Sequence, residues 1–253
     1  MGVRSQIGVV NVFDAPFEVW STRETTPEEA MELVKRGGLS LVEALHTRDE
    51  LLEVVSDHRE AAAYMLREHA NNALENHVER ALEESVEYKN LLAQMPARVP
   101  RALDSYQGEF SGHDAKAAND AINTHGVELA QGQVLFHGGK WPTSEESFAT
   151  ERPFSTSFCP QVALRNAEWR GKAYDAGRVD LMVVSVKNPS TKAFAYRREG
   201  THGNEKEVVF ASGATLTRIR ETHIADFKVA KSDGLSRTLE KTVPGYLVEI
   251  EIS

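Results

Sequence analysis

The stretch GNEKEVVFASG, residues 203–213, begins with loop-forming residues and continues into an apolar, β-favouring segment. Two carboxylates, Glu205 and Glu207, stand two positions apart where the loop enters this segment. Because residues i and i+2 of a strand point the same way, the pattern predicts two acids on one face and Lys206 on the other. Like charges this close repel each other unless a cationic group lies between them. The pair is therefore more typical of a functional site than of a purely structural strand.

Two earlier segments look like core strands that carry polar side chains. The first, VLFHGG at residues 134–139, places His137 at the end of an apolar run, and two glycines then let a ligand approach the backbone closely. The second, PFSTSF at residues 153–158, alternates so that Ser155 and Ser157 share one face. Taken alone, each is better explained by an ordinary turn or a half-exposed strand, just as a solvated strand edge is the plain alternative for the acid pair.

In this order, the three segments resemble the motifs of the mono-ADP-ribosyltransferase superfamily, toxin-like enzymes that transfer ADP-ribose from NAD. Residues 154–157 and 205–209 match the Ser-Thr-Ser and Glu-x-Glu motifs of its arginine-type members. The helical pattern of residues 160–167 is also similar, and the resemblance covers about residues 130–252. The chain departs from the pattern at His137, where the arginine-type members have arginine. A His-Gly pair is found there in the diphtheria-toxin and poly-ADP-ribose polymerase branch.

The resemblance implies a separate role for each acid. Glu207 corresponds to the catalytic glutamate, which stabilises the positive charge on the ribose as the nicotinamide bond breaks. Ser155 would hold this carboxylate in place. Glu205 corresponds to the residue that engages the acceptor, and a protein arginine is the first expectation because guanidinium groups pair well with carboxylates. The loop of residues 196–204 would recognise the acceptor.

The resemblance also implies a binding site for NAD, which is the substrate. The residues that it assigns to this site are His137, Gly138, Ser155, Thr156, Ser157, Phe158, Arg165 and Arg170. Gly138 would offer its backbone to the nicotinamide amide. An aromatic ring would stack on the nicotinamide, and the choice among Phe154, Phe158 and Trp169 stays open.

The pyrophosphate of NAD requires a cation, and histidine is not a reliable cation at neutral pH. His137 is instead expected to contact the adenosine ribose. Arg165 and Arg170 are the candidates for the pyrophosphate, since they follow the Ser-Thr-Ser strand and its helix.

The N-terminal part of the chain reads as mainly helical. Residues 7–20 predict a short strand or an extended arm. Helices are predicted from the capping box at Thr26 to Gly37, from the capping box at Ser40 to about Val55, over residues 57–94 as the longest stretch, and over residues 113–123. Residues 97–113 look like a connector.

From residue 130 the pattern changes to short β-favouring runs separated by turn residues. Strands are predicted at residues 134–136, 154–158, 181–186, 193–196, 208–211, 215–219 and 246–252, with one helix over 161–169. Together with the resemblance, these patterns predict an α+β chain. A helical N-terminal lobe, residues 1–112, would precede a mixed or antiparallel β-sandwich of the ADP-ribosyltransferase type, residues 113–253.

Composition narrows the class of protein further. Of the 253 residues, 41% are hydrophobic, which is enough for a substantial core. No run approaches the roughly 20 apolar residues of a membrane helix, and the first residues lack the long apolar stretch expected of a secretory signal. The net charge of −9 gives no overall attraction to nucleic acid or to an anionic membrane. The single cysteine, Cys159, excludes an internal disulfide and a cysteine-based zinc site. We therefore expect a chain that acts in the cytoplasm of the producing or the target cell, without a membrane and without a metal.

The expected partners are NAD and a macromolecular acceptor, with a protein first and RNA or DNA second. The N-terminal helices are expected either to pack on the β-rich part or to bind a partner protein such as an antitoxin. An alternative is a catalytically inactive relative that serves as a binding module or inhibitor. The presence of both Glu205 and Glu207 favours catalysis, because a decayed site has no reason to keep two carboxylates that repel each other.

Overall fold

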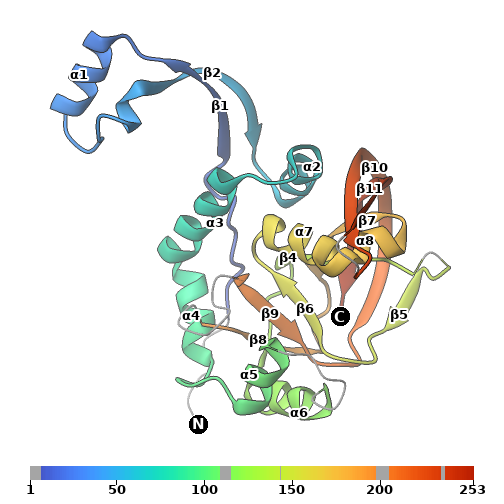
Figure 1. Cartoon of the computed structure of the whole chain (residues 1–253). Coiled ribbons are helices and arrows are strands. Elements are labelled where there is room, and N and C mark those ends of the chain that lie inside the picture. The colour runs from blue at the N-terminus through green and yellow to red at the C-terminus, as the bar shows by residue number, and fades with distance from the viewer. Residues whose placement is uncertain (1–6, 109–114, 143, 198–204, 235–236) are drawn as a thin grey trace.

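One large sheet organises the body of the molecule (Figure 1). The computed structural model describes residues 7–108, 115–142, 144–197, 205–234 and 237–253. Within them the sheet has nine strands, in the order β3-β8-β9-β6-β4-β7-β11-β10-β5. The strands are β3 (Val127–Glu128), β4 (Val134–Gly139), β5 (Ser147–Ala149), β6 (Phe154–Ser157), β7 (Val179–Val186), β8 (Lys192–Ala195), β9 (Glu207–Phe210), β10 (Thr215–Ser232) and β11 (Thr238–Ile252). Neighbours are antiparallel except β7 and β11, which are parallel. The α+β class with a large mixed sheet agrees with the prediction at this level.

The sheet has a weak seam between β4 and β6. These strands share one pair of facing residues, Phe136 and Ser157, whereas every residue of β4 faces a residue of β7. Beyond that pair, Nδ1 of His137 lies 2.6 Å from the carbonyl oxygen of Ser155, so a side chain continues the link between the strands. The predicted motif residues therefore meet where the two halves of the sheet join.

Helix α7 (Pro160–Glu168) covers β4 and β7, and it packs so closely on β4 that one of the two motif positions must be glycine. A Cβ added to Gly138 would lie 1.6 Å from the carbonyl oxygen of Ala163 in this helix. No side chain fits at that distance, so Gly138 permits the close packing of helix on strand. At Gly139 a side chain is disfavoured for a different reason, because a Cβ there would lie 2.9 Å from Nε2 of His137. Packing within the fold thus explains both glycines, and the role of Gly138 toward nicotinamide stays a prediction.

The N-terminal helices are α1 (Pro27–Lys35), α2 (His58–Glu68), α3 (Asn72–Glu84), α4 (Val86–Gln94), α5 (Arg101–Gly108) and α6 (Ala115–His125), followed later in the chain by α8 (Lys172–Ala176). Helix α2 packs against α7, β7, β10 and β11. Its fully buried residues Met65 and Leu66 belong to the same hydrophobic core as Phe136 and Leu181 of the sheet. One core therefore extends across the predicted boundary at residue 112, and the division into two domains stays a prediction.

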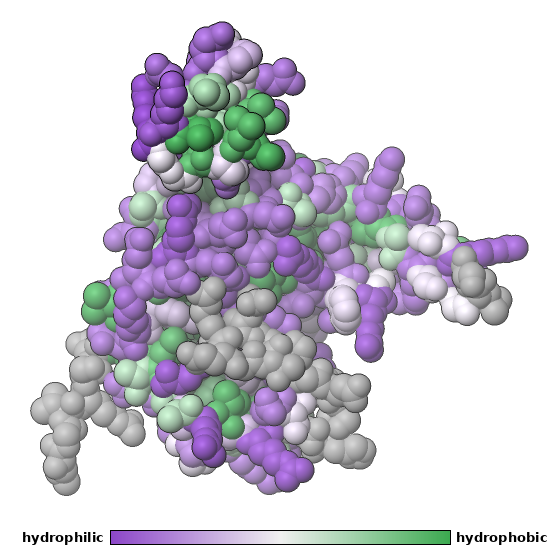
Figure 2. Space-filling view, turned by 60° about the vertical axis from the view of Figure 1, so that its left-hand side comes forward, coloured by the Kyte–Doolittle hydropathy of each residue, from purple (hydrophilic) through white to green (hydrophobic). Residues whose placement is uncertain are grey.

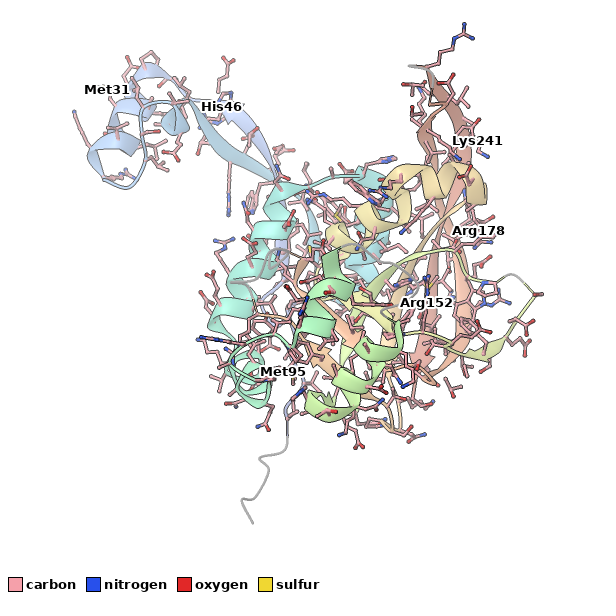
Figure 3. All side chains as sticks on the ribbon, turned by 60° about the horizontal axis from the view of Figure 1, so that its bottom comes forward. Met31, His46, Met95, Arg152, Arg178 and Lys241 are labelled. Carbon is pink, nitrogen blue, oxygen red and sulfur yellow. The ribbon has the colours of Figure 1, made fainter. Side chains whose placement is uncertain are left out.

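An arm projects from this body (Figure 1), made of β1 (Phe17–Glu24), α1 and β2 (His46–Val55). The capping box at Thr26 forms as predicted, with the Thr26 hydroxyl accepting from the Glu29 amide and the Glu29 carboxylate accepting from the Thr26 amide. Figure 3 shows Met31 and His46 on the arm, well away from the body. Apolar side chains gather at its end (Figure 2). Leu41 and Val42, in the segment between α1 and β2, are exposed.

The prediction of a helix from Ser40 to about Val55 was wrong. The Ser40 amide and hydroxyl do donate to the Glu43 carboxylate, at 2.8 and 2.7 Å, but only one 3-10 turn follows, at Glu43–Leu45. Residues 46–55 then form β2 and pair antiparallel with β1. Hydrogen bonds to another strand thus replaced those of a helix, which a local capping signal cannot foresee.

Two further expectations changed. The stretch 57–94 is divided into α2, α3 and α4, since Asn71 and Ser85 each cap a new helix. The connector at 97–113 contains α5, while residues 109–114, where the next helix was predicted to begin, lie outside the described residues. Within the described part of the chain, the helices are too short or too polar to cross a membrane.

Candidate active site

Glu207 is the first residue of β9, which lies between β6 and β8 in the sheet. Its side chain is buried, and each carboxylate oxygen receives a hydrogen bond from a neutral donor. The Ser155 hydroxyl donates to Oε1, and the Gln107 amide Nε2 donates to Oε2 at 2.8 Å. The carboxylate is therefore held from two sides by segments far apart in the sequence.

Burial raises the pKa of Glu207 to about 7. The negative charge of Glu205 raises this pKa as well, while the hydrogen bonds from Ser155 and Gln107 lower it. The shift means that the carboxylate carries its charge at a cost, since little solvent stabilises it. A strongly raised pKa next to a second carboxylate is typical of a catalytic group.

The acid pair is separated by a residue with an unusual backbone. Lys206 has φ of 50°, in the left-handed region, and its side chain is only 1% exposed. Its Nζ lies 3.3 Å from Oε1 of Glu75 and 3.0 Å from Oε1 of Glu79, both on α3. The cation nearest in sequence to the acids is thus turned away from them, and its charge is used in an ion pair with the N-terminal part.

The Ser-Thr-Ser strand positions the backbone around the acids. The Thr156 hydroxyl donates to the carbonyl of Val208, and the Ser157 hydroxyl donates to the carbonyl of Glu205, both at 2.6 Å. Ser155 is the member of the motif that reaches the Glu207 carboxylate. Each hydroxyl of the motif therefore fixes a different point of residues 205–208.

Phe158 lies in the hydrophobic core. Its ring is 1% exposed and packs edge-on against Tyr88, with centroids 5.5 Å apart. Phe154 lies instead against His137, with centroids 4.4 Å apart, and Trp169 is 61% exposed. Of the three aromatic residues suggested for the nicotinamide, Phe158 is thus the one already enclosed by protein.

His137 is neutral at physiological pH. Burial, together with the positive charges of Lys172 and Arg152, lowers its pKa to about 4, although the hydrogen bond to the Ser155 carbonyl acts the other way. A carbonyl can only accept, so the contact with the Ser155 carbonyl requires the proton on Nδ1. Nε2 is then the acceptor of the ring, and His137 is suited to a hydroxyl rather than to a phosphate.

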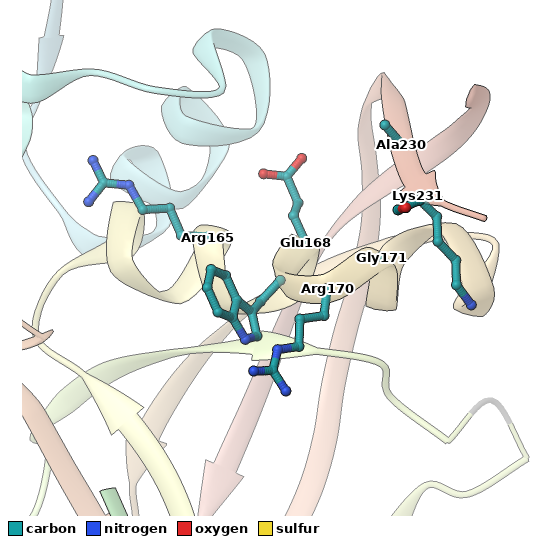
Figure 4. A pocket seen from close by; sticks show the side chains of 8 residues that line it. Arg165, Glu168, Arg170, Gly171, Ala230 and Lys231 are labelled. Atoms are coloured by element: carbon teal, nitrogen blue, oxygen red, sulfur yellow. The ribbon is translucent and has the colours of Figure 1, made fainter. Parts of the chain in front are cut away.

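Arg165 and Arg170 do not share the surroundings of Glu207. Both line an open hollow of about 650 Å³ at the end of α7, together with Lys231, and they extend in different directions (Figure 4). The described residues that line this hollow include neither Glu207 nor His137. Arg165 also pairs with Glu75, at 3.1 Å. Their assignment to the pyrophosphate stays a prediction.

Three residues near the site were not singled out from the sequence. Gln107 lies in a stretch read as a connector, where no motif marks it. Arg152 and Lys172 carry the positive charges that act on His137. Arg152 directly precedes the PFSTSF segment, so its position next to that motif was a signal that could have found it. The acceptor-recognition loop predicted at 196–204 lies outside the described residues from residue 198 onward.

No family model matches this chain, and no curated protein matches it. The enzymatic component C2-I of the C2 toxin from Clostridium botulinum, solved at pH 3.0, is 9% identical with a TM-score of 0.36, over 66% of this chain and 45% of that chain. Vis toxin, an ADP-ribosyltransferase from Vibrio splendidus, is 12% identical with a TM-score of 0.33, over 91% of this chain and 88% of that chain.

Exoenzyme S from Pseudomonas aeruginosa, solved with human 14-3-3 protein beta and bound to carba-NAD, is also similar. It is 12% identical with a TM-score of 0.33, over 76% of this chain and 88% of that chain. The chain therefore spans less than half of the C2-I component but most of the other two.

Proposed function

We propose that this chain is an NAD-dependent mono-ADP-ribosyltransferase that releases nicotinamide and passes ADP-ribose to a macromolecular acceptor. The observation that carries the proposal is the buried Glu207 carboxylate, held by Ser155 on one oxygen and by Gln107 on the other. Neither donor is a cation, so the ionised carboxylate keeps its full charge in a site of low dielectric. A fixed negative charge of this kind stabilises the positive ribose of the transition state.

The proposed reaction exchanges one bond at C1′ of the ribose. The bond from C1′ to the nicotinamide nitrogen breaks, and nicotinamide leaves as a neutral molecule with the bonding electron pair. Glu207 stabilises the resulting charge and accepts a hydrogen bond from the 2′-hydroxyl of the ribose. The acceptor nucleophile then bonds to C1′ and gives its proton to Glu205. Glu205 lies close enough to Glu207 for its charge to raise the pKa of that residue.

The surroundings of His137 support a place for the rest of the dinucleotide. Its Nε2 is an acceptor and would take a hydrogen bond from a hydroxyl of the adenosine ribose. Lys172 and Arg152 bring positive charge to the same place and are the better candidates for the pyrophosphate. Arg165 is already paired with Glu75, although a ligand could compete for it.

The first test is NAD cleavage by the wild-type chain and by Glu207→Gln. Nicotinamide release and transfer of labelled ADP-ribose to lysate should fall at least about 100-fold in the variant, the scale of removing a key electrostatic group. Because Glu207 has a pKa of about 7 and acts as the carboxylate, wild-type activity should rise from pH 6 to pH 8. Equal activity of the two proteins would exclude this role for Glu207.

A second experiment separates the acceptor classes. Protease or nuclease treatment of the labelled product distinguishes a protein, the first expectation, from RNA or DNA. Glu205→Gln should lose transfer to arginine while NAD cleavage continues, because only the acceptor step needs Glu205. If transfer survives, the acceptor is engaged in another way. An inactive binding module would instead retain NAD without releasing nicotinamide, in the wild type as in the variant.

A further inference from the structure

Helix α5 belongs to the N-terminal part of the chain but is fastened to the β-rich part at two points. The carbonyl of Leu103 accepts a hydrogen bond from the buried Tyr196 hydroxyl, at 2.9 Å. The Tyr106 hydroxyl donates to the carbonyl of Pro153, at 3.0 Å, immediately before β6. Leu103 itself is fully buried. Gln107 follows Tyr106 directly, so its amide is delivered by an anchored helix rather than by a free loop.

The contact of Gln107 complements that of Ser155. Ser155 occupies Oε1 of Glu207, and Gln107 Nε2 occupies Oε2 at 2.8 Å. With one donor, a carboxylate can still turn about its last bond, whereas two donors on different oxygens fix its plane. We propose that Gln107 is a positioning residue for the reaction, which orients the Glu207 carboxylate and makes α5 part of the catalytic site. This inference rests on the proposed function.

The kind of donor matters as much as its position. A lysine or arginine at this point would neutralise Glu207 and reduce its attraction for a positive ribose. The ammonium group of the nearby Lys206 is instead held by Glu75 and Glu79, both of which lie on α3. A neutral amide orients the carboxylate without cancelling its charge. That combination is what a group that stabilises an oxocarbenium-like transition state requires.

Activity of Gln107→Met is the first part of the test. Methionine has a similar length but no donor, so NAD cleavage at pH 7 should fall about tenfold or more, as expected for a lost hydrogen bond to a charged group. The matched control is Gln94→Met, the same change on α4, which should keep wild-type activity. Unchanged or increased activity of Gln107→Met would overturn the proposal, and an increase would mean that the amide obstructs the site.

The pH profile separates positioning from a merely structural role. The hydrogen bond from Gln107 lowers the pKa of Glu207, so its loss should move the acid limb of kcat/KM to higher pH. Gln107→Lys puts a cation at the same reach and should move the limb to lower pH, with a reduced plateau. A loss of activity with no shift in either variant, together with a lower Tm, would assign Gln107 a structural role only and would overturn the proposal.

A direct titration makes the result independent of catalysis. The Glu207 carboxyl resonance, identified by its absence in Glu207→Gln, can be followed by ¹³C NMR in the wild type and in Gln107→Met. If the pKa of Glu207 is higher in Gln107→Met than in the wild type, but the wild type does not cleave NAD, the contact between Gln107 and Glu207 is confirmed and the proposed function is refuted. If the wild type cleaves NAD but the pKa of Glu207 is the same in both proteins, the role of Gln107 is refuted and the proposed function stands.

Discussion

The N-terminal arm and the body of the molecule both contain ion pairs, but these pairs differ in how far they are buried. In the arm, Arg23 and Glu29 form an ion pair at 2.9 Å, with side chains 44% and 43% exposed. In the body, Lys206 pairs with Glu79 at 3.0 Å, with the lysine side chain 1% exposed. The distances are nearly equal, but water screens the second pair less, because the Lys206 side chain is buried and the Glu79 side chain is 28% exposed. Burial, rather than the contact itself, determines how much each pair matters.

Apolar side chains follow the same contrast. Val208 and Val209 of β9 are fully buried, whereas Leu41 and Val42 of the arm are 59% and 75% exposed. The apolar residues of β9 are thus packed in the core next to Glu207, whereas those of the arm are in contact with water. Variants in the two regions should therefore differ in their unfolding free energies.

The largest effect is expected for Lys206→Met. Removing one partner of a buried ion pair leaves the carboxylates of Glu75 and Glu79 without this cation and should cost about 3–5 kcal/mol of unfolding free energy. Urea unfolding measures the loss. The matched control is Lys187→Met, whose pair with Glu251 is 2.7 Å long but 54% exposed on the lysine side, and it should cost no more than about 1 kcal/mol. Similar losses in both variants would contradict the role of burial.

A smaller, pH-dependent effect is expected where the arm joins the body. The His58 ring lies between Phe13 and Phe136, with centroids 5.2 and 5.6 Å away, and within the described structure its Nε2 has no hydrogen-bond partner. Burial lowers its pKa to about 4, although the charge of Asp57 acts the other way. The folded-state pKa is below the unfolded one, so this stability is complete above pH 6.5 and is lost as pH falls toward 4.

His58→Phe should remove that acid sensitivity. The wild type should lose about 2–3 kcal/mol more than the variant between pH 6.5 and pH 4, measured as the difference in unfolding free energy. His223→Phe is the control, since the His223 side chain is 50% exposed. If His58→Phe loses as much stability as the wild type on acidification, His58 is not the group that titrates.

The smallest effect is expected in the arm. Val42→Ala should change the unfolding free energy by no more than about 0.5 kcal/mol, because the side chain is already in water. The same change at the buried Val209 should cost about 1.5–3 kcal/mol. Thermal unfolding of both variants gives the comparison. A large loss at Val42 would show that the end of the arm is covered in solution.

Sequence reasoning predicted those parts of the molecule that depend on local pattern. Thr26 caps a helix as its motif indicates, and each strand predicted in the C-terminal part is present. However, β10 and β11 are much longer than the predicted 215–219 and 246–252, and the short strands β3 and β5 were not predicted. The pairing of Ser155 with Glu207 was expected from the resemblance, and the structure brings these two side chains together. The predicted cytoplasmic location and a partner for the N-terminal helices stay predictions.

What escaped prediction depends on contacts between distant residues. Gln107 reaches Glu207 across 100 positions, and Lys206 reaches Glu75 across 131. No spacing rule connects such positions in a single sequence. The strand at 46–55 was missed for the same reason, because its partner β1, rather than its own capping signal, decides its conformation.

The two-sided hold on Glu207 also sets the time at which the site can exist. Its donors, Gln107 and Ser155, lie 100 and 52 positions before it, and synthesis on the ribosome proceeds from the N-terminus. A growing chain therefore contains both donors long before the carboxylate that they hold. Under the proposed function, cleavage of NAD therefore requires β9 to have emerged and inserted between β6 and β8, so the site is completed late in synthesis.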